Sequence, residues 1–305
     1  MLINYTSKEL DLLARIMRAE ALAEGNLGML MVGNVIVNRA IANCLDFKKI
    51  RTLKEGIIFD GLYSASIGYF DKLLDNHGIQ YKTLHMEHDP NFGGKMPDPK
   101  PKYLGELIER VKYSENKIGL ANDGDADRFG VINENGEYVS PNEIIAILLK
   151  YLVKKGYKGA VVKTVGSSLI INRVAEKLGI EVIETAVGFK HVGEAMRKNQ
   201  VIIGGEESGG LSILGHIPEK DGLIANLLVL EAMADENKTL VELQNEIYEL
   251  GGKFYTDRID IKLNDTSEIK PLLKKFNDIK KIENKGLTPT AFNDRMSKRL
   301  RESSR

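Results

Sequence analysis

The sequence predicts an α/β protein built from two consecutive domains, each a sheet covered by helices, with a helical N-terminal segment and an incomplete C-terminal unit. Short runs rich in β-branched residues alternate with amphipathic segments of helical length from about residue 57 onward. The chain has 305 residues, of which 43% are hydrophobic, so it can bury more than one core. Polar or glycine-rich loops follow several apolar runs, which is where α/β sheets place ligands.

The same pattern divides the chain into residues 1–55, 56–155, 156–255 and 256–305. The first segment is expected to be helical, because Thr6 and Glu9 have the spacing of a capping box and an apolar face follows them. Expected strands are 56–59, 80–84, 118–121, 160–163, 181–184, 201–203 and 256–262, and expected helices are 68–76, 103–113, 141–154, 168–178, 190–198 and 267–276. Residues 129–140 predict a hairpin in which Asn135 and Gly136 suit a type I′ turn.

Composition excludes several classes of partner. Lys+Arg number 43 and Asp+Glu number 43, so the net charge is zero and we expect neither nucleic acid nor a membrane as partner. The longest apolar stretches, 27–37 and 144–153, are shorter than the roughly 18–20 residues that a spanning helix needs. The first residues lack the pattern of a secretory signal, and Cys44 is the single cysteine. We therefore expect a cytoplasmic protein.

Three carboxylates follow the predicted strand 118–121 at alternate positions, Asp123, Asp125 and Asp127. They repel one another unless a cation lies among them, and oxygen ligands from a short loop suit a hard cation such as Mg²⁺. Arg128 would keep the site attractive to anions. A calcium-binding EF-hand is rejected because its sixth loop position requires glycine and here holds Arg128. An acidic surface turn is the alternative.

A glycine-rich loop, GGEESGG at 204–210, follows the predicted strand 201–203. Glycines let a ligand approach the backbone, while Glu206 and Ser208 can form hydrogen bonds with the hydroxyls of a sugar. Taken alone, this loop is better explained as a structural turn with solvated glutamates than as a sugar-binding loop. Residues 185–190, which include Gly188, form another loop at an expected strand end. Residues 216–222, near the glycine-rich loop in the sequence, add the imidazole of His216 and the cation of Lys220.

Six motifs occur in the order seen in α-D-phosphohexomutases, the family of phosphoglucomutase and phosphomannomutase: FDGLYSASIGYF, DPNFGGKMPDP, DGDADR, VGFK, GGEESGG and EKDG. Residues 57–280 therefore resemble the second and third domains of that family and the first part of its fourth. The resemblance implies a Mg²⁺ held by the three aspartates, sugar hydroxyls held by Glu206 and Ser208, and sugar or phosphate contacts from Gly188 and Lys220. The implied partner is a hexose phosphate, of glucose or mannose, and the implied reaction moves phosphate between C1 and C6.

Two motifs of the family are missing. No serine in the chain is followed by histidine, so the family's Ser-His-Asn-Pro nucleophile loop is absent, as is its Arg-Pro-Ser-Gly-Thr phosphate loop. We therefore expect a chain of phosphohexomutase lineage that is inactive alone. A Mg²⁺-dependent module that binds sugar phosphate without turnover is the first alternative.

A separate resemblance concerns LLARIMRAEALAEGNLGMLMVGNVIVNRA, which is similar to the opening of spore-cortex-lytic cell-wall hydrolases. In that family the residue matching Glu20 is the acid that cleaves the glycan. Glu20 also falls on the apolar side of the expected helix, where burial favours the protonated form. A glycan hydrolase that uses Glu20 is the second alternative, although only residues 6–50 carry the resemblance.

Overall fold

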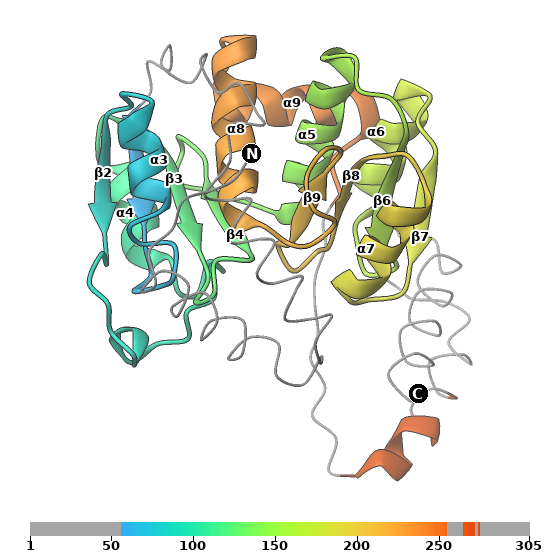
Figure 1. The fold of residues 1–305 in the computed structure, drawn as a ribbon, viewed down its shortest axis with the longest axis horizontal. Coiled ribbons are helices and arrows are strands. Elements are labelled where there is room, and N and C mark those ends of the chain that lie inside the picture. Colours follow the sequence, from blue (N-terminus) through green and yellow to red (C-terminus); the bar gives the residue numbers. More distant parts are fainter. Residues whose placement is uncertain (1–55, 255–264, 272–273, 275–305) are drawn as a thin grey trace, which may run out of the picture.

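Two mixed sheets lie side by side in the computed structural model of the chain, with helix α8 (Gly222–Glu236) between them (Figure 1). The structure describes residues 56–254, 265–271 and 274. The expected N-terminal helices, Glu20 and the expected strand 256–262 lie outside the described residues. No described helix has the length and apolarity needed to span a membrane.

The first sheet has the strand order β2-β1-β3-β4-β5. Its strands are β1 (Gly56–Asp60), β2 (Tyr81–Leu84), β3 (Asn116–Asn122), β4 (Phe129–Ile132) and β5 (Tyr138–Val139). The first three strands are parallel, so their carboxyl ends share one edge, and β4 and β5 form an antiparallel hairpin after them.

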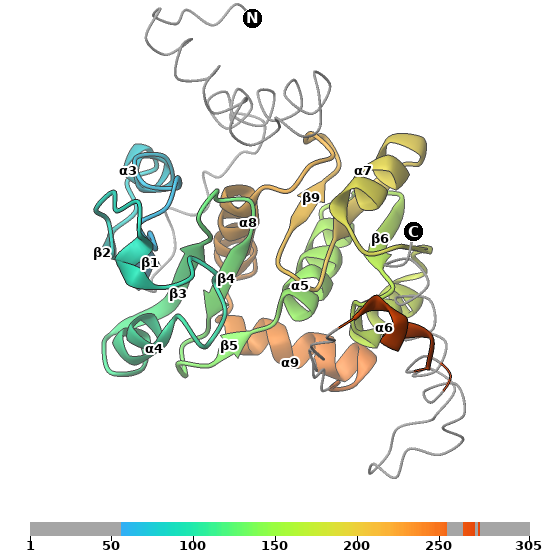
Figure 2. The ribbon, with the colours of Figure 1, turned by 90° about the horizontal axis from the view of Figure 1, so that it is seen from below.

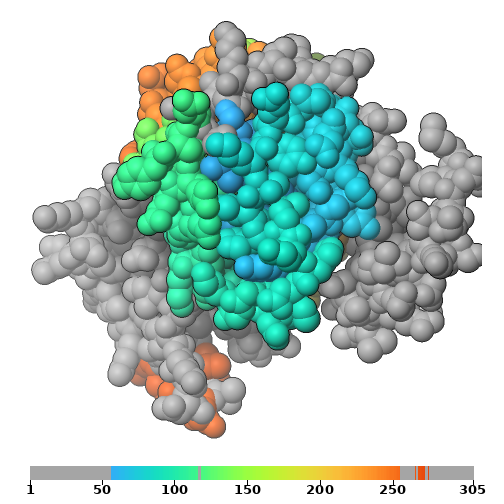
Figure 3. Space-filling model, turned by 90° about the vertical axis from the view of Figure 1, so that its left-hand side faces the viewer, coloured from blue at the N-terminus to red at the C-terminus, as the bar shows by residue number. Residues whose placement is uncertain are grey.

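Side chains of the first sheet alternate between two helical layers. Ile57 and Phe59 belong to the large core with α3 (Phe70–Asn76) and α8, whereas Ile58 packs with α4 (Gly105–Lys112). Burial on both faces explains the apolar run 57–59 within β1. Figure 3 views this unit from outside, where the blue to blue-green segment from β1 through α4 covers the face and the green hairpin lies along its edge.

The second sheet has the order β7-β6-β8-β9. Its strands are β6 (Ala160–Thr164), β7 (Val182–Thr185), β8 (Val201–Gly205) and β9 (Leu211–Ile213), of which the last is antiparallel. Helix α7 (Phe189–Lys198) covers one face, while α5 (Pro141–Lys154) and α6 (Leu169–Leu178) cover the other. Ser140 and Glu143 form a full capping box at the start of α5.

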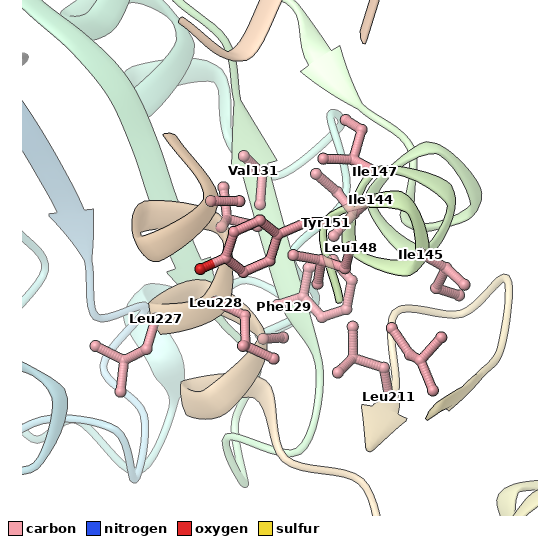
Figure 4. Packing of buried hydrophobic residues seen from close by; sticks show 14 of the residues in the cluster. Phe129, Val131, Ile144, Ile145, Ile147, Leu148, Tyr151, Leu211, Leu227 and Leu228 are labelled. Atoms are coloured by element: carbon pink, nitrogen blue, oxygen red, sulfur yellow. The ribbon is translucent and has the colours of Figure 1, made fainter. Parts of the chain in front are cut away.

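Helix α8 packs against both units, and α9 (Leu240–Gly251), which packs on α5 and α6, accepts a hydrogen bond at Gln244 Oε1 from Asn133 Nδ2 of the first unit at 3.0 Å (Figure 2). The sequence pattern did not predict α8, because its residues 222–233 are buried on all sides and show no amphipathic stripe. It packs against β3 and β4 of the first sheet as well as α5 and β9 of the second. Figure 4 shows the core at this junction, with labelled side chains from β4, α5, β9 and α8: Phe129, Val131, Ile144, Ile145, Ile147, Leu148, Tyr151, Leu211, Leu227 and Leu228.

The turn between β4 and β5 differs from the sequence prediction. Within this fully described turn only Gly136 has a positive φ, of 74°, whereas a type I′ turn needs positive φ at Asn135 as well. The type I′ prediction is wrong because Asn133 directs the turn: its Oδ1 accepts hydrogen bonds from the backbone N–H groups of Asn135 and Glu137, each at 3.0 Å.

Candidate functional site

Asp123, Asp125 and Asp127 lie in the loop after β3, at the carboxyl edge of the first sheet, and we call residues 123–128 the metal loop. One carboxylate oxygen from each aspartate lies within 4.8 Å of the others. Asp123 is buried, Asp125 is exposed and Asp127 is intermediate. The loop therefore presents a graded set of oxygen ligands that runs from the protein interior to solvent.

Arg128 holds the inner carboxylate in place. Its backbone N–H donates to Asp123 Oδ1 at 2.9 Å and its Nε donates to Asp123 Oδ2 at 2.5 Å. A guanidinium nitrogen of Arg128 also lies 3.5 Å from Asp98 Oδ1. Asp98 belongs to the proline-rich loop before α4, and the sequence analysis did not identify it. Its only signal was its place in the motif DPNFGGKMPDP.

The donor set fits a divalent cation. Burial raises the pKa of Asp123 to about 7, and the charges of Asp127 and Asp125 act in the same direction. Asp127 Oδ1 is buried and accepts no hydrogen bond, although Arg128 Nε lies 3.7 Å away. A cation among the three carboxylates would remove both the mutual repulsion and this unsatisfied acceptor.

The glycine-rich loop follows β8 at the carboxyl edge of the second sheet, and we call residues 204–210 the sugar loop. Glu206 Oε1 accepts a hydrogen bond from Gly188 N at 2.9 Å, and Ser208 Oγ lies 3.5 Å from Glu206 Oε2. Burial raises the pKa of Glu206 above its ordinary value. The structure thus brings together Gly188, Glu206 and Ser208, three of the residues that the sequence indicated as sugar contacts.

The sugar loop contacts β4 at the residue that directly follows the metal loop. Phe129 N donates to Gly209 O at 3.1 Å. Gly209 has a φ of 104°, and a Cβ there would lie 3.1 Å from Phe129 O, so only glycine fits this close approach. Gly222, at the start of α8, donates its N–H to Ala126 O of the metal loop at 3.1 Å.

Lys220 completes the junction between the two loops. Its Nζ forms an ion pair with Asp127, and its stem crosses Gly210, where a Cβ would come within 2.5 Å of Lys220 Cδ. His216, from the same segment, lies with its Nε2 3.2 Å from Asp221 Oδ2, and Asp221 caps the N-terminus of α8. Asp221 therefore fixes the position of the segment that contains Lys220.

Sequence reasoning also missed Thr164 and Glu207. Thr164 Oγ1 donates to Glu207 Oε2 at 2.7 Å, and Glu207 covers Gly166, where a Cβ would come within 2.6 Å of Glu207 Oε1. This pair ties the sugar loop to the loop between β6 and α6. No signal in the sequence linked these residues, which are 43 positions apart.

Comparison with known proteins gives the family. Two family models match: "Phosphoglucomutase/phosphomannomutase, alpha/beta/alpha domain II" over residues 38–136, and the corresponding domain III over residues 140–250. The chain belongs to the phosphoglucomutase/phosphomannomutase family. The domain II match begins at residue 38, inside the segment that resembled a cell-wall hydrolase, and that resemblance is not borne out.

Several relatives and solved structures are similar to parts of this phosphohexomutase-family chain. The phosphoglucosamine mutase of Methanococcus vannielii is 32% identical over 225 residues, which cover 71% of this chain and 50% of the relative. That of Carboxydothermus hydrogenoformans is 43% identical over 143 residues, covering 46% of this chain and 32% of the relative. This chain spans about half the length of the first curated relatives that it matches.

A putative phosphomannomutase from Thermus thermophilus has a TM-score of 0.68 at 33% identity, with 72% of this chain and 51% of that chain covered. The N-acetylphosphoglucosamine mutase of Aspergillus fumigatus, solved in complex with GlcNAc-6P and magnesium, has a TM-score of 0.57 at 13% identity and shows a shared fold. That match covers 85% of this chain and 68% of that chain. Both likenesses agree with two consecutive phosphohexomutase-type α/β domains.

Proposed function

We propose that this chain binds Mg²⁺ in the metal loop and a hexose phosphate in the adjoining sugar loop, as the ligand-binding part of a phosphohexomutase. One observation carries the proposal. The stem of Lys220 lies over Gly210 of the sugar loop, and its Nζ forms an ion pair with Asp127 of the metal loop. The proposed cation site and the side chain proposed to bind phosphate are therefore in contact. The family membership of both domains supports this assignment.

Different residues would bind the two ligands. Asp123, Asp125 and Asp127 would hold Mg²⁺, which would supply a positive charge that stabilises a phosphoryl group during transfer. Glu206 accepts hydrogen bonds from sugar hydroxyls through the lone pairs that Gly188 does not use. Lys220 binds the phosphate as a point charge.

The proposed substrate is a hexose phosphate of the glucose or mannose type, and the names of the relatives add glucosamine phosphate to that class. Glu206 and Ser208 serve several patterns of hydroxyls, so the proposal is of a class rather than of one sugar. The proposed location is the cytoplasm, as the sequence led us to expect.

Calorimetry with glucose 1-phosphate, mannose 1-phosphate and glucosamine 1-phosphate in the presence of Mg²⁺ tests the proposal. Glu206→Gln should weaken binding of the preferred sugar phosphate by about tenfold, because a charged acceptor of hydroxyl hydrogen bonds is replaced by a neutral one. Glu194→Gln is the matched control, since Glu194 is exposed on α7 and its ion pair within the described residues is with Lys198, on the same helix. Equal affinities of wild type and Glu206→Gln would contradict the proposed sugar contact.

A further inference from the structure

A hydrogen-bonded pair of side chains, Asp60 and His85, lies beside the metal loop at the carboxyl ends of β1 and β2. Asp60 ends β1 and is only 1% exposed. Its Oδ1 accepts hydrogen bonds from His85 Nδ1 at 2.8 Å and from Leu62 N at 3.0 Å. A carboxylate can only accept here, so Nδ1 of His85 carries the proton. On its other side, His85 Nε2 lies 3.3 Å from Glu106 Oε2.

Backbone strain is concentrated around this pair. Six non-glycine residues have positive φ in the described part of the chain, and all but Asn237 lie in the loops after β1, β2 and β3. These five are Leu62, Tyr63, His85, Phe92 and Ala126. Conformations of this kind persist only where the surroundings enforce them, and they are enriched at functional sites.

The loops after β1 and β2 are joined to each other next to the pair. Gly61 N donates to Leu84 O at 2.9 Å, and Tyr63 N donates to His85 O at 3.0 Å. The rings of Tyr63 and His85 lie with centroids 5.0 Å apart. The Tyr63 ring also fills the space over Gly93, where a Cβ would come within 2.6 Å of it.

Both loops then hold the metal loop at Gly124, the residue between the first two aspartates. Ala65 N, from the loop after β1, donates to Gly124 O at 3.1 Å. Gly124 N donates to Pro97 O, from the loop after β2, also at 3.1 Å. The Phe92 ring lies against the same glycine, at 3.5 Å from where its Cβ would be. The position of Gly124 therefore depends on the loops after β1 and β2, which are joined to each other at Asp60 and His85.

We propose that Asp60 and His85 form a positioning pair for the metal loop, which holds the loops after β1 and β2 in the strained conformation that fixes Gly124 between Asp123 and Asp125. The effect on Mg²⁺ rests on the proposed function, whereas the effect on loop position does not. Asp60 Oδ2 is buried without a hydrogen-bond partner, so the stabilisation of the carboxylate rests on the two donors to Oδ1, His85 Nδ1 and Leu62 N, of which His85 is the one from another strand end. Loss of that donor favours movement of Asp60 toward water and relaxation of both loops.

Two near-isosteric variants test the contacts of the two imidazole nitrogens of His85 separately. The amide nitrogen of asparagine occupies the position of Nδ1, so His85→Asn keeps a donor for Asp60, and asparagine also tolerates the φ of 49° at this residue. The amide nitrogen of glutamine occupies the position of Nε2, so His85→Gln keeps a donor toward Glu106 and loses the one to Asp60. His77→Gln, at the end of α3, is the control for replacement of a histidine elsewhere in the same unit.

The experiment measures amide hydrogen exchange of Gly124 in the metal-free 305-residue protein, and then the Mg²⁺ isotherm of each variant by calorimetry. We expect His85→Gln to speed exchange at Gly124 and to weaken Mg²⁺ binding by about tenfold, the lower end of what loss of a group supporting metal ligands costs. His85→Asn and His77→Gln should stay within about twofold of wild type in both measurements.

Wild-type exchange at Gly124 in folded His85→Gln would overturn the proposal, as would equal effects of the asparagine and glutamine variants. If His85→Gln fails to fold, Asp60→Leu, which has no acceptor for His85 Nδ1, should speed exchange at Gly124, and wild-type exchange there would overturn the proposal. If wild type binds no Mg²⁺, the proposed metal function fails, and the exchange measurement alone decides whether the pair positions the loop.

Discussion

Lys220 and Asp127 form an ion pair that joins the two family domains at the candidate site. Asp127 belongs to the loop after β3, and Lys220 belongs to the segment before α8. The pair places a cation from one domain on a carboxylate that Mg²⁺ would also use. In the proposed function the ammonium group and the metal ion would therefore compete for Asp127, while both would attract phosphate.

Lys220→Met should change two affinities in opposite directions. Mg²⁺ should bind severalfold more tightly because a competing cation is gone, and glucose 1-phosphate should bind about tenfold more weakly because one charge-assisted contact is lost. Calorimetry of each ligand measures both effects. Lys198→Met, at an exposed position of α7, should change neither. A loss of both affinities in Lys220→Met would argue for local misfolding in place of competition.

The 305-residue chain should bind hexose phosphate without converting it. The resemblance to the family implies that turnover needs a phosphoserine, and the chain has no serine followed by histidine. Ser64 and Ser66 lie near the metal loop, but both are buried and their hydroxyls bond to each other at 2.7 Å. A coupled dehydrogenase assay with glucose 1-phosphate, Mg²⁺ and a trace of hexose bisphosphate measures conversion. Steady turnover that Asp125→Asn abolishes would reveal a nucleophile that we have not identified.

Stability should depend on pH through His85. The hydrogen bond to Asp60 raises the pKa of His85 above its ordinary value, and its side chain is 23% exposed. The folded-state pKa exceeds the unfolded value of about 6.5, so the contribution of protonated His85 is fully present below that value. It is lost as the pH rises through the folded-state pKa. Urea unfolding of wild type and His85→Asn from pH 5.5 to 8.5, a range of about three units, measures it. A stability difference that is constant over this range would contradict the assignment.

The core between α5, α8 and β4 should be sensitive to cavities. Leu148 is fully buried there, so Leu148→Ala should lower the free energy of unfolding by about 3 kcal/mol. Leu214→Ala is the control, because Leu214 is 37% exposed and should change stability by about 0.5 kcal/mol or less. Urea unfolding gives both values. Equal losses in the two variants would show that this junction is not tightly packed.

Hydrophobic pattern was enough to predict strands β1, β2, β3, β6, β7 and β8 and helices α3 to α7 within a few residues, because the strands are short apolar or β-branched runs and the helices show a helical period. It failed for α8, whose apolar residues face neighbours on every side, and it also missed α9, although Thr239 and Glu242 form a capping box at the start of that helix. The family models divide the chain between residues 136 and 140, ahead of α5, whereas the sequence pattern suggested a division near residue 155.

The two site loops could be predicted, but the contacts that position them could not. The aspartates and the glycine-rich run follow apolar strands directly, so their place at a sheet edge can be read from the sequence. Asp60 and His85 are 25 residues apart, and neither stands in a pattern that indicates its partner. Such a pair depends on which strands are neighbours in the sheet, and local periodicity does not carry that information.

In the proposed function, a divalent cation in the metal loop lies next to the phosphate of a bound hexose phosphate. The most direct measurement is the ³¹P relaxation of glucose 1-phosphate with Mn²⁺ in place of Mg²⁺, for wild type and for Asp125→Asn at equal concentrations. We expect wild type to enhance ³¹P relaxation well beyond the level given by Mn²⁺ and the sugar phosphate alone, and Asp125→Asn to lose most of that enhancement. Equal relaxation with wild type, with Asp125→Asn and without protein would contradict the claim.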